Sequence, residues 1–265
     1  MVVSRAVNVL FVGDVVGAGA TRYVATRLPE LRCEHDVDLV VANAENCAPS
    51  GLGMTTELVD LLMRSGVDVI TGGNHSWDGP EADSALAHPR VLRPHNVRDG
   101  VPGRGQVHLT VGEETVTVVN LADPAALRSV EVVRGRVFHH YSGWLLAERR
   151  GTVIVDLHGD RVIEKQIFAH AVDGDAAAVL GTHSHEPTLP LHLLPGGTAL
   201  VTDVGMTGPT GGVQGFSHRL FVDALRETGD HFGLGIPPVM EGPIVLGAVL
   251  LRIEGGRTTR ISRLE

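Results

Sequence analysis

Residues 37–46, VDLVVANAEN, join a short apolar, β-branched run to a polar ending. Runs of this kind, bounded by Gly, Asn or Asp, are typical of buried strands in a sheet with both faces covered. Four more segments have the same form: VLFVGD at 9–14, VITGGNH at 69–75, VIVDLH at 153–158 and VLGTHSH at 179–185. The repetition predicts an α/β chain whose strands deliver polar side chains to one end of the sheet.

Segments of helical period separate these strands. The segment TTELVDLLMRSG, residues 55–66, opens with a threonine cap, carries leucines on one face and stops at a glycine. Expected strands cover 7–12, 37–42, 67–71, 107–111, 115–120, 152–157, 177–181 and 199–203. Expected helices cover 20–31, a run from 55, about ten residues between 157 and 177, and 216–228.

Two hairpins add antiparallel pairs, so the sheets are predicted to be mixed. One turns at Gly112-Glu113-Glu114 and the other lies at the C-terminus, where IVLGAVLLRIEGG precedes RTTRISRLE. Residues 121–150 have weak periodicity and predict a small cap-like excursion. Because the chain has no internal repeat, low-complexity tract or linker, residues 1–265 are interpreted as a single domain.

Composition narrows the class of protein. A hydrophobic content of 43% suffices for a large core, and a net charge of -9 argues against a broad basic surface for duplex nucleic acid. A small anionic ligand is therefore the expected partner. No apolar run approaches the roughly 18 residues of a membrane span, and the N-terminus lacks a signal-peptide pattern. We expect a cytoplasmic enzyme without membrane association; Cys33 and Cys47 are too few for a disulfide framework.

The polar residues at the strand ends are metal-ligand types. Carboxylate, amide and imidazole groups gathered from several strands are what a two-metal hydrolytic site requires. Glu45 is the expected bridge, because its two oxygens can hold two cations. Asp14 would complete one metal site, Asn74 the other, and Asn46 would add a neutral oxygen. The alternative for Glu45 is a helix-capping role after its strand.

Histidines extend this set. His183 and His185 would point in opposite directions in an extended segment, so a shared site needs a turn, which Gly181 makes feasible. His158 shares a strand face with Asp156, a candidate acceptor for its second ring N–H, although a satisfied core histidine is the alternative. His75 directly follows Asn74 and is the expected proton donor to the leaving group. The other histidines are expected to be surface or packed residues, including the adjacent pair at 139–140.

These residues carry a resemblance to the calcineurin-like metallophosphoesterase superfamily. GGNH at 72–75 and GTHSH at 181–185 fit its pattern of Gly-Asn-His and Gly-x-His-x-His. The chain departs from that pattern with Val16, where a histidine is usual, and with Glu45 in place of a bridging Asp. Both departures, together with GDVVG at 13–17, NAEN at 43–46 and TDVGMTGP at 202–209, are similar to the YmdB-like family of phosphodiesterases.

The resemblance implies a four-layered α/β/β/α fold, a dinuclear iron or manganese centre, with zinc or magnesium as alternatives, and hydrolysis of small phosphodiesters such as 2′,3′-cyclic nucleotides. A metal-bridging hydroxide would attack in line while His75 assists the leaving oxygen. Carried over, the ligands of one metal are Asp14, Glu45, Asn46 and His185. Those of the other are Glu45, Asn74, His158 and His183.

Other functions stay open at this point. The glycines of GDVVGAGATR suggest a dinucleotide-binding oxidoreductase, but their spacing is G-x-x-x-G-x-G and the second strand ends in Asn43 instead of an acidic residue. A metal-holding regulatory or scaffold protein with incidental phosphatase activity is the second alternative, because a ligand set reports which chemistry can occur and not which is used. A homo-oligomer, paired through the apolar C-terminal hairpin, is also open.

Overall fold

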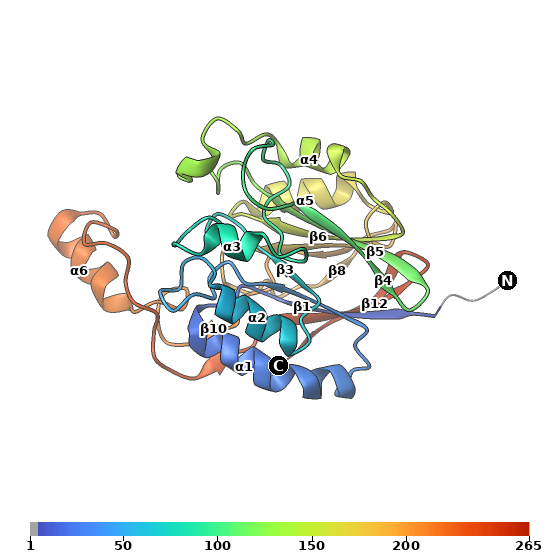
Figure 1. The fold of residues 1–265 in the computed structure, drawn as a ribbon, viewed down its shortest axis with the longest axis horizontal. Helices are drawn as coiled ribbons and strands as arrows, with labels where there is room; N and C mark the ends of the chain where they lie inside the picture. Colours follow the sequence, from blue (N-terminus) through green and yellow to red (C-terminus); the bar gives the residue numbers. More distant parts are fainter. Residues whose placement is uncertain (1–4, 265) are drawn as a thin grey trace.

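The computed structural model describes residues 5–264, which form two β-sheets packed face to face with helices on both outer sides (Figure 1). The first sheet has the order β13-β12-β1-β2-β3. Its strands are β1 (Val7–Val12), β2 (Leu39–Asn43), β3 (Val69–Thr71), β12 (Ala248–Glu254) and β13 (Arg257–Leu264). The strand β1 runs parallel to β2 and antiparallel to β12, so this sheet is mixed.

The second sheet has the order β4-β5-β6-β7-β9-β8. Its strands are β4 (Gln106–Val111), β5 (Glu114–Ala122), β6 (Thr152–His158), β7 (Ala178–Thr182), β8 (His192–Leu193) and β9 (Ala199–Val201). The strands β5, β6, β7 and β9 are parallel, while β4 and β8 are antiparallel edges. A separate short pair joins β10 (Gly208–Pro209) to β11 (Ile244–Val245).

Helices cover the outer face of each sheet (Figure 1). The helices α1 (Gly17–Glu34), α2 (Thr56–Arg64) and α3 (Ala82–Leu86) belong to the side of the first sheet, and α4 (His140–Leu146) and α5 (Val162–Ala171) to that of the second. A 3-10 turn, η1, spans Glu131–Val133. The four-layered α/β/β/α architecture implied by the resemblance is confirmed.

Alternation along the strands explains the layers. In β1, Val9 and Phe11 point into the core between the sheets, where they meet Val118 of β5 and Ile154 of β6. Leu10, the neighbour of both Val9 and Phe11, faces the helices of the first layer instead. The strands β2, β6 and β7 are buried along their whole length, as their apolar runs predict, whereas the edge strand β13 carries three arginines and is partly exposed.

Several boundaries differ from the prediction. The helix α1 begins at Gly17, three residues before the predicted start, and continues past Pro29 to Glu34. The threonine cap of α2 is present, with the Thr55 hydroxyl accepting from the backbone N–H of Leu58. The strand β5 extends to Ala122, so the segment at 121–150 opens with strand residues and contains α4.

The C-terminal hairpin is present, but its apolar face is used inside the chain. The core between the sheets contains Val249, Leu251 and Ile253 of β12. These apolar side chains are therefore not available for pairing between subunits. The helix α6 (His218–Thr228) lies on an arm that projects from the body (Figure 1). Among the described residues, none of the helices combines the length and apolar character that crossing a membrane requires.

Candidate metal centre

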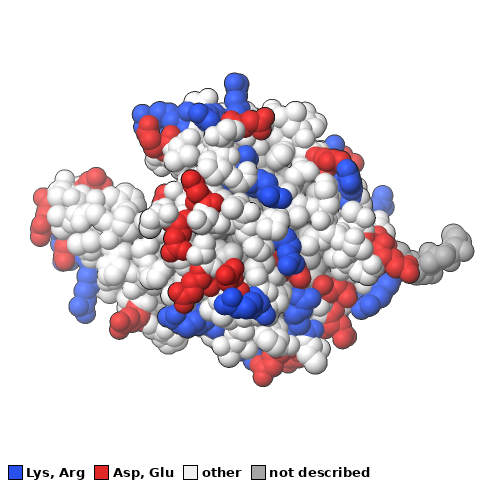
Figure 2. Space-filling model, viewed as in Figure 1, with Lys and Arg blue, Asp and Glu red and all other residues white. Residues whose placement is uncertain are grey.

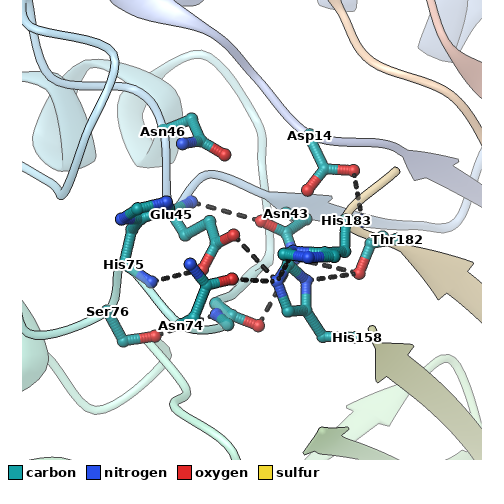
Figure 3. Close-up of polar contacts among 12 residues, drawn as sticks. Asp14, Asn43, Glu45, Asn46, Asn74, His75, Ser76, His158, Thr182 and His183 are labelled. Atoms are coloured by element: carbon teal, nitrogen blue, oxygen red, sulfur yellow. Dashed lines mark hydrogen bonds and ion pairs between the residues drawn. The ribbon is translucent and has the colours of Figure 1, made fainter. Parts of the chain in front are cut away.

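The loops that follow β1, β2, β3, β6 and β7 converge where the two sheets meet, and they bring the predicted ligands together (Figure 3). Asp14, Glu45 and Asn74 come from the first sheet, and His158 and His183 from the second. Close approach needs a residue without a side chain beside the histidine, because a Cβ on Gly73 would lie 2.3 Å from the His158 ring.

His158 is the centre of the cluster. Its Nε2 lies 2.8 Å from Asn74 Oδ1, 3.0 Å from Glu45 Oε1 and 2.9 Å from His183 Nδ1. One ring nitrogen carries at most one hydrogen, so it cannot bond to all three at once. Metal ligands held about 2.1 Å from a shared cation lie roughly 3 Å from each other, which is the spacing of this group.

The other nitrogen of His158 is held by a relay. Nδ1 lies 2.9 Å from Thr182 Oγ1, and this hydroxyl donates to Asp156 Oδ1 at 2.7 Å. The expected direct pairing of His158 with Asp156 is therefore wrong, because the threonine stands between them. The other oxygen of Asp156 accepts from Thr71 at 2.6 Å and from Asn43 at 3.0 Å. Burial raises the pKa of Asp156 to about 6.

Glu45 lies between His158 of the second sheet and His75 of the first. Its Oε1 meets His158, and its Oε2 accepts from the backbone N–H of His75 at 2.9 Å. Burial by itself would raise the pKa of Glu45, but the charge and hydrogen bond of His158 outweigh it and lower the pKa to about 2. The same contact raises the pKa of His158 against the effect of burial. This carboxylate is therefore ionised, and its two oxygens are held by His158 and by the backbone of His75.

A second group lies beside the first and contains two unsatisfied oxygens. Asp14 Oδ1 and Asn46 Oδ1 are buried without a hydrogen-bond partner among the described residues. His185 Nε2 lies 3.8 Å from Asp14 Oδ1, and its Nδ1 lies 2.9 Å from the carbonyl of Gln214. A carbonyl only accepts, so Nδ1 carries the hydrogen and Nε2 has the free lone pair. Burial raises the pKa of Asp14.

The turn that brings His183 and His185 together is made by these residues themselves. Both have left-handed backbone, with φ of 101° and 65°. Such values are costly for residues with a side chain and occur where the surrounding structure enforces them. Gly181, the predicted source of the turn, lies inside β7, where a Cβ would come within 2.0 Å of the Thr202 carbonyl oxygen. The turn is present, but that part of the prediction is wrong.

His75 lies at the rim, partly exposed to solvent. Its Nδ1 is 2.7 Å from Asp78 Oδ2, a partner that the sequence analysis missed. Burial disfavours the charged ring, but the hydrogen bond with Asp78 and the charge of Glu45 prevail and raise the pKa of His75. Asp78 thus fixes the ring and leaves Nε2 free.

Other supporting residues were also missed. Asn43 and Thr182 end their strands beside predicted ligands, so their position at the strand end was the available signal. Lys165 is the only lysine of the chain and is buried, with Nζ donating to the Thr182 carbonyl at 2.8 Å. Asp203 lies 3.5 Å from that Nζ and accepts from the backbone N–H of Ser184 at 3.0 Å. Nothing in the local sequence pairs Lys165 with this loop.

The adjacent histidines at 139–140 do not both lie on the surface. His139 is exposed and caps α4 by accepting from the backbone N–H of Tyr141. His140 is buried, stacks on His139 and meets Phe168 edge-on. Cys47 is a buried core residue.

The donors fit a divalent metal. Four acidic residues at or beside the cluster are buried, namely Asp14, Glu45, Asp156 and Asp203, and the buried ammonium of Lys165 lies near Asp203. The unsatisfied oxygens of Asp14 and Asn46 and the crowded His158 nitrogen are both explained by cations between these groups.

Comparison with known proteins decides the family. The family described as "YmdB-like protein" matches residues 10–264. The chain belongs to the YmdB-like family. The Bacillus subtilis (strain 168) protein named "2',3'-cyclic-nucleotide 2'-phosphodiesterase" is 32% identical to this YmdB-like chain over 259 residues, covering 93% of this chain and 91% of the relative.

Solved structures agree with this assignment. A hypothetical protein from Thermus thermophilus matches the YmdB-like chain with a TM-score of 0.85 and 36% identity, covering 97% of this chain and 98% of that one. A novel phosphatase from Mycoplasma pneumoniae matches with a TM-score of 0.87 and 25% identity, covering 98% and 93%. The YmdB-like chain is thus a metallophosphoesterase-type phosphoric ester hydrolase that uses metal ions.

Proposed function

We propose that the protein hydrolyses small phosphodiesters such as 2′,3′-cyclic nucleotides with two bound metal ions, iron or manganese. The proposal is carried by the convergence of Glu45, Asn74 and His183 on one nitrogen of His158, beside the unsatisfied oxygens of Asp14 and Asn46. It is supported by the name of the Bacillus subtilis relative.

The two groups of the cluster would each hold one ion. Glu45 would be the bridging ligand, because an ionised carboxylate offers two oxygens to two cations. Asp14, Asn46 and His185 complete one site, and Asn74, His158 and His183 complete the other. When bound, the cations polarise the phosphate oxygens and lower the pKa of water so that it becomes a nucleophile near neutral pH.

His75 would supply the proton to the leaving oxygen. Asp78 accepts from Nδ1 and stabilises the protonated ring, so Nε2 is the atom from which a proton can pass. The ring is partly exposed, whereas Glu45 and His158 are buried, so the phosphate would approach from the side of His75. The charged groups on the face shown in Figure 2 alternate in sign without a continuous basic band, which suits a small substrate better than a duplex.

The test combines metal analysis with turnover of 2′,3′-cyclic nucleotides, other phosphodiesters and monoesters. His75→Ala is expected to keep its metal and lose about 10²-fold or more in kcat, whereas Glu45→Gln is expected to lose metal and activity together. Asp78→Asn serves as the matched variant and should retain more activity than His75→Ala. An unchanged rate in His75→Ala would remove the proton-donor assignment, and negligible turnover of the whole panel at full metal content would overturn the function.

A further inference from the structure

A pocket away from the metal centre contains a buried cation without an anion. Arg93 is only 6% exposed, and within residues 5–264 it forms no ion pair. Its NH1 donates to the carbonyls of Pro94 at 2.7 Å and Val97 at 3.5 Å. Its buried Nε has no partner among the described residues. A guanidinium has five N–H donors, so most of the hydrogen-bonding capacity of Arg93 is unused.

Buried charges are normally paired, since removal from water is costly without a counter-charge. Asp99 lies at the same pocket and favours the charged form of Arg93, but it is exposed and makes no ion pair with that side chain. Burial lowers the pKa of Arg93, yet an arginine in a protein remains protonated. The site therefore presents a cation whose natural complement is an oxyanion, either a carboxylate or a phosphate.

The rest of the pocket suggests the form of such a ligand. Its volume is about 540 Å³, within the range of roughly 300 to 1,000 Å³ that is usual for small-molecule sites. Arg98 also lines the pocket and contributes a second, exposed cation. Val97, Phe138 and Leu146 form an apolar wall. None of the lining residues belongs to the proposed metal ligands.

We propose that this pocket binds a small oxyanion with a compact apolar body, its carboxylate or phosphate group paired with Arg93 and Arg98 and its body against Phe138. The binding is independent of the phosphodiester chemistry. Hydrogen bonds nevertheless connect the pocket to the metal centre. The backbone N–H of His95, which lines the pocket, donates to the Asn120 carbonyl. Asn120 Oδ1 in turn accepts from the N–H of Gly72, two residues before the proposed ligand Asn74.

Calorimetric titration of the full-length, metal-loaded protein tests the proposal with two probes, benzoate and phenyl phosphate, which separate a carboxylate ligand from a phosphate ligand. Benzamide is the uncharged control for benzoate. At least one of the two anions is expected to bind saturably. Its Kd should rise several-fold in Arg98→Gln and at least about tenfold in Arg93→Met, the usual effect of removing a charged hydrogen-bond partner.

Matched variants separate the pocket from other sites. Arg90→Gln, an exposed arginine outside the pocket, should leave the Kd unchanged, while Asp99→Asn should lower it because a repelling carboxylate is removed. Turnover of a phosphodiester should be unaffected in Arg98→Gln. If Arg93→Met does not fold, the proposal is still tested by the Kd of the other two variants, which should rise in Arg98→Gln and fall in Asp99→Asn. The proposal would be overturned if neither anion binds saturably or if benzamide binds as tightly as benzoate. It would also be overturned if the Kd is the same in wild type, Arg98→Gln and Asp99→Asn.

Discussion

Thr182 determines which nitrogen of His158 is available to a metal. A threonine hydroxyl has one hydrogen, and here it is donated to Asp156, so the hydroxyl must accept from His158 Nδ1–H. The free lone pair of His158 is then on Nε2, the atom that faces Glu45 and Asn74. Thr182 thereby orients His158, a proposed metal ligand, without itself contacting the metal.

Thr182→Val should therefore weaken metal binding. The isosteric valine leaves Nδ1 of His158 without its acceptor, and loss of such an outer partner typically costs about 10- to 100-fold in metal affinity. Thr182→Ser should restore most of the affinity, measured by competition with a chelator.

The control for that experiment is Thr71→Val, which removes another hydroxyl bonded to Asp156 but has no contact with His158. Both valine variants should unfold more easily, by about 1 to 3 kcal/mol for an unsatisfied buried group. Only Thr182→Val should lose affinity for metal. Equal affinities in the two variants would show that the hydroxyl has a structural role alone.

Gly73 is needed for packing and not for backbone conformation. Its φ is not in the left-handed region, yet a Cβ would lie 2.3 Å from the His158 ring. Gly73→Ala should displace that ring, with loss of bound metal and a lower melting temperature. Gly19→Ala is the matched change, since a Cβ there meets nothing within 4 Å and the residue lies in α1. It should stabilise the protein by up to about 1 kcal/mol. Unaltered metal content in Gly73→Ala would contradict the packing argument.

At the scale of elements, the sequence predicts what depends on local pattern. Alternation and strand-end polarity correctly predict β1, β2, β6 and β7, because each is an apolar run with a marked end. The helix α4 was missed because its burial depends on tertiary contacts: Trp144 packs edge-on against Phe168 of α5, which is distant in sequence. Periodicity over seven residues cannot show this.

Phe168 also packs against His140, and the burial of this histidine gives α4 a pH dependence. Burial, followed by the charge of His139, lowers the pKa of His140 to about 4. Its unfolded pKa is about 6.5, so the stability that the neutral ring contributes is present above that pH and declines as the pH falls towards 4. His140→Phe should remove this loss. Between pH 7 and pH 5 the wild-type free energy of unfolding should fall by about 1 to 2 kcal/mol more than that of the variant.

Denaturant titrations at the two pH values measure the difference, and His192→Phe is the control. His192 is exposed on β8 and does not contribute to the pKa shift of His140, so this substitution should leave the wild-type pH dependence in place. Parallel losses in wild type and His140→Phe would mean that the buried ring does not contribute to acid sensitivity.

At the scale of the molecule, the predicted ligands come from both sheets, and the sequence could not show how the sheets meet. It identified ligand types because Asp, Asn and His end apolar runs. It could not identify Gln214, whose carbonyl orients His185 from the start of the projecting arm, or the distant Lys165 and Asp203. Those contacts follow from the packing of sheet on sheet and from long loops.

Because the proposed ligands come from both sheets, bound metal should cross-link the sheets. Without cations, Asp14 and Asn46 keep unsatisfied buried oxygens. Chelation should therefore lower the melting temperature by about 5 to 15 °C, the shift expected when a ligand is present at 100 to 1,000 times its Kd. Adding Mn²⁺ or Fe²⁺ back should reverse the change, measured by scanning calorimetry. Glu45→Gln is the control, because a variant without the bridging carboxylate should respond little to either treatment. A wild-type melting temperature that is unaffected by chelation, with loss of metal verified, would show that the sheets are held together without the ions.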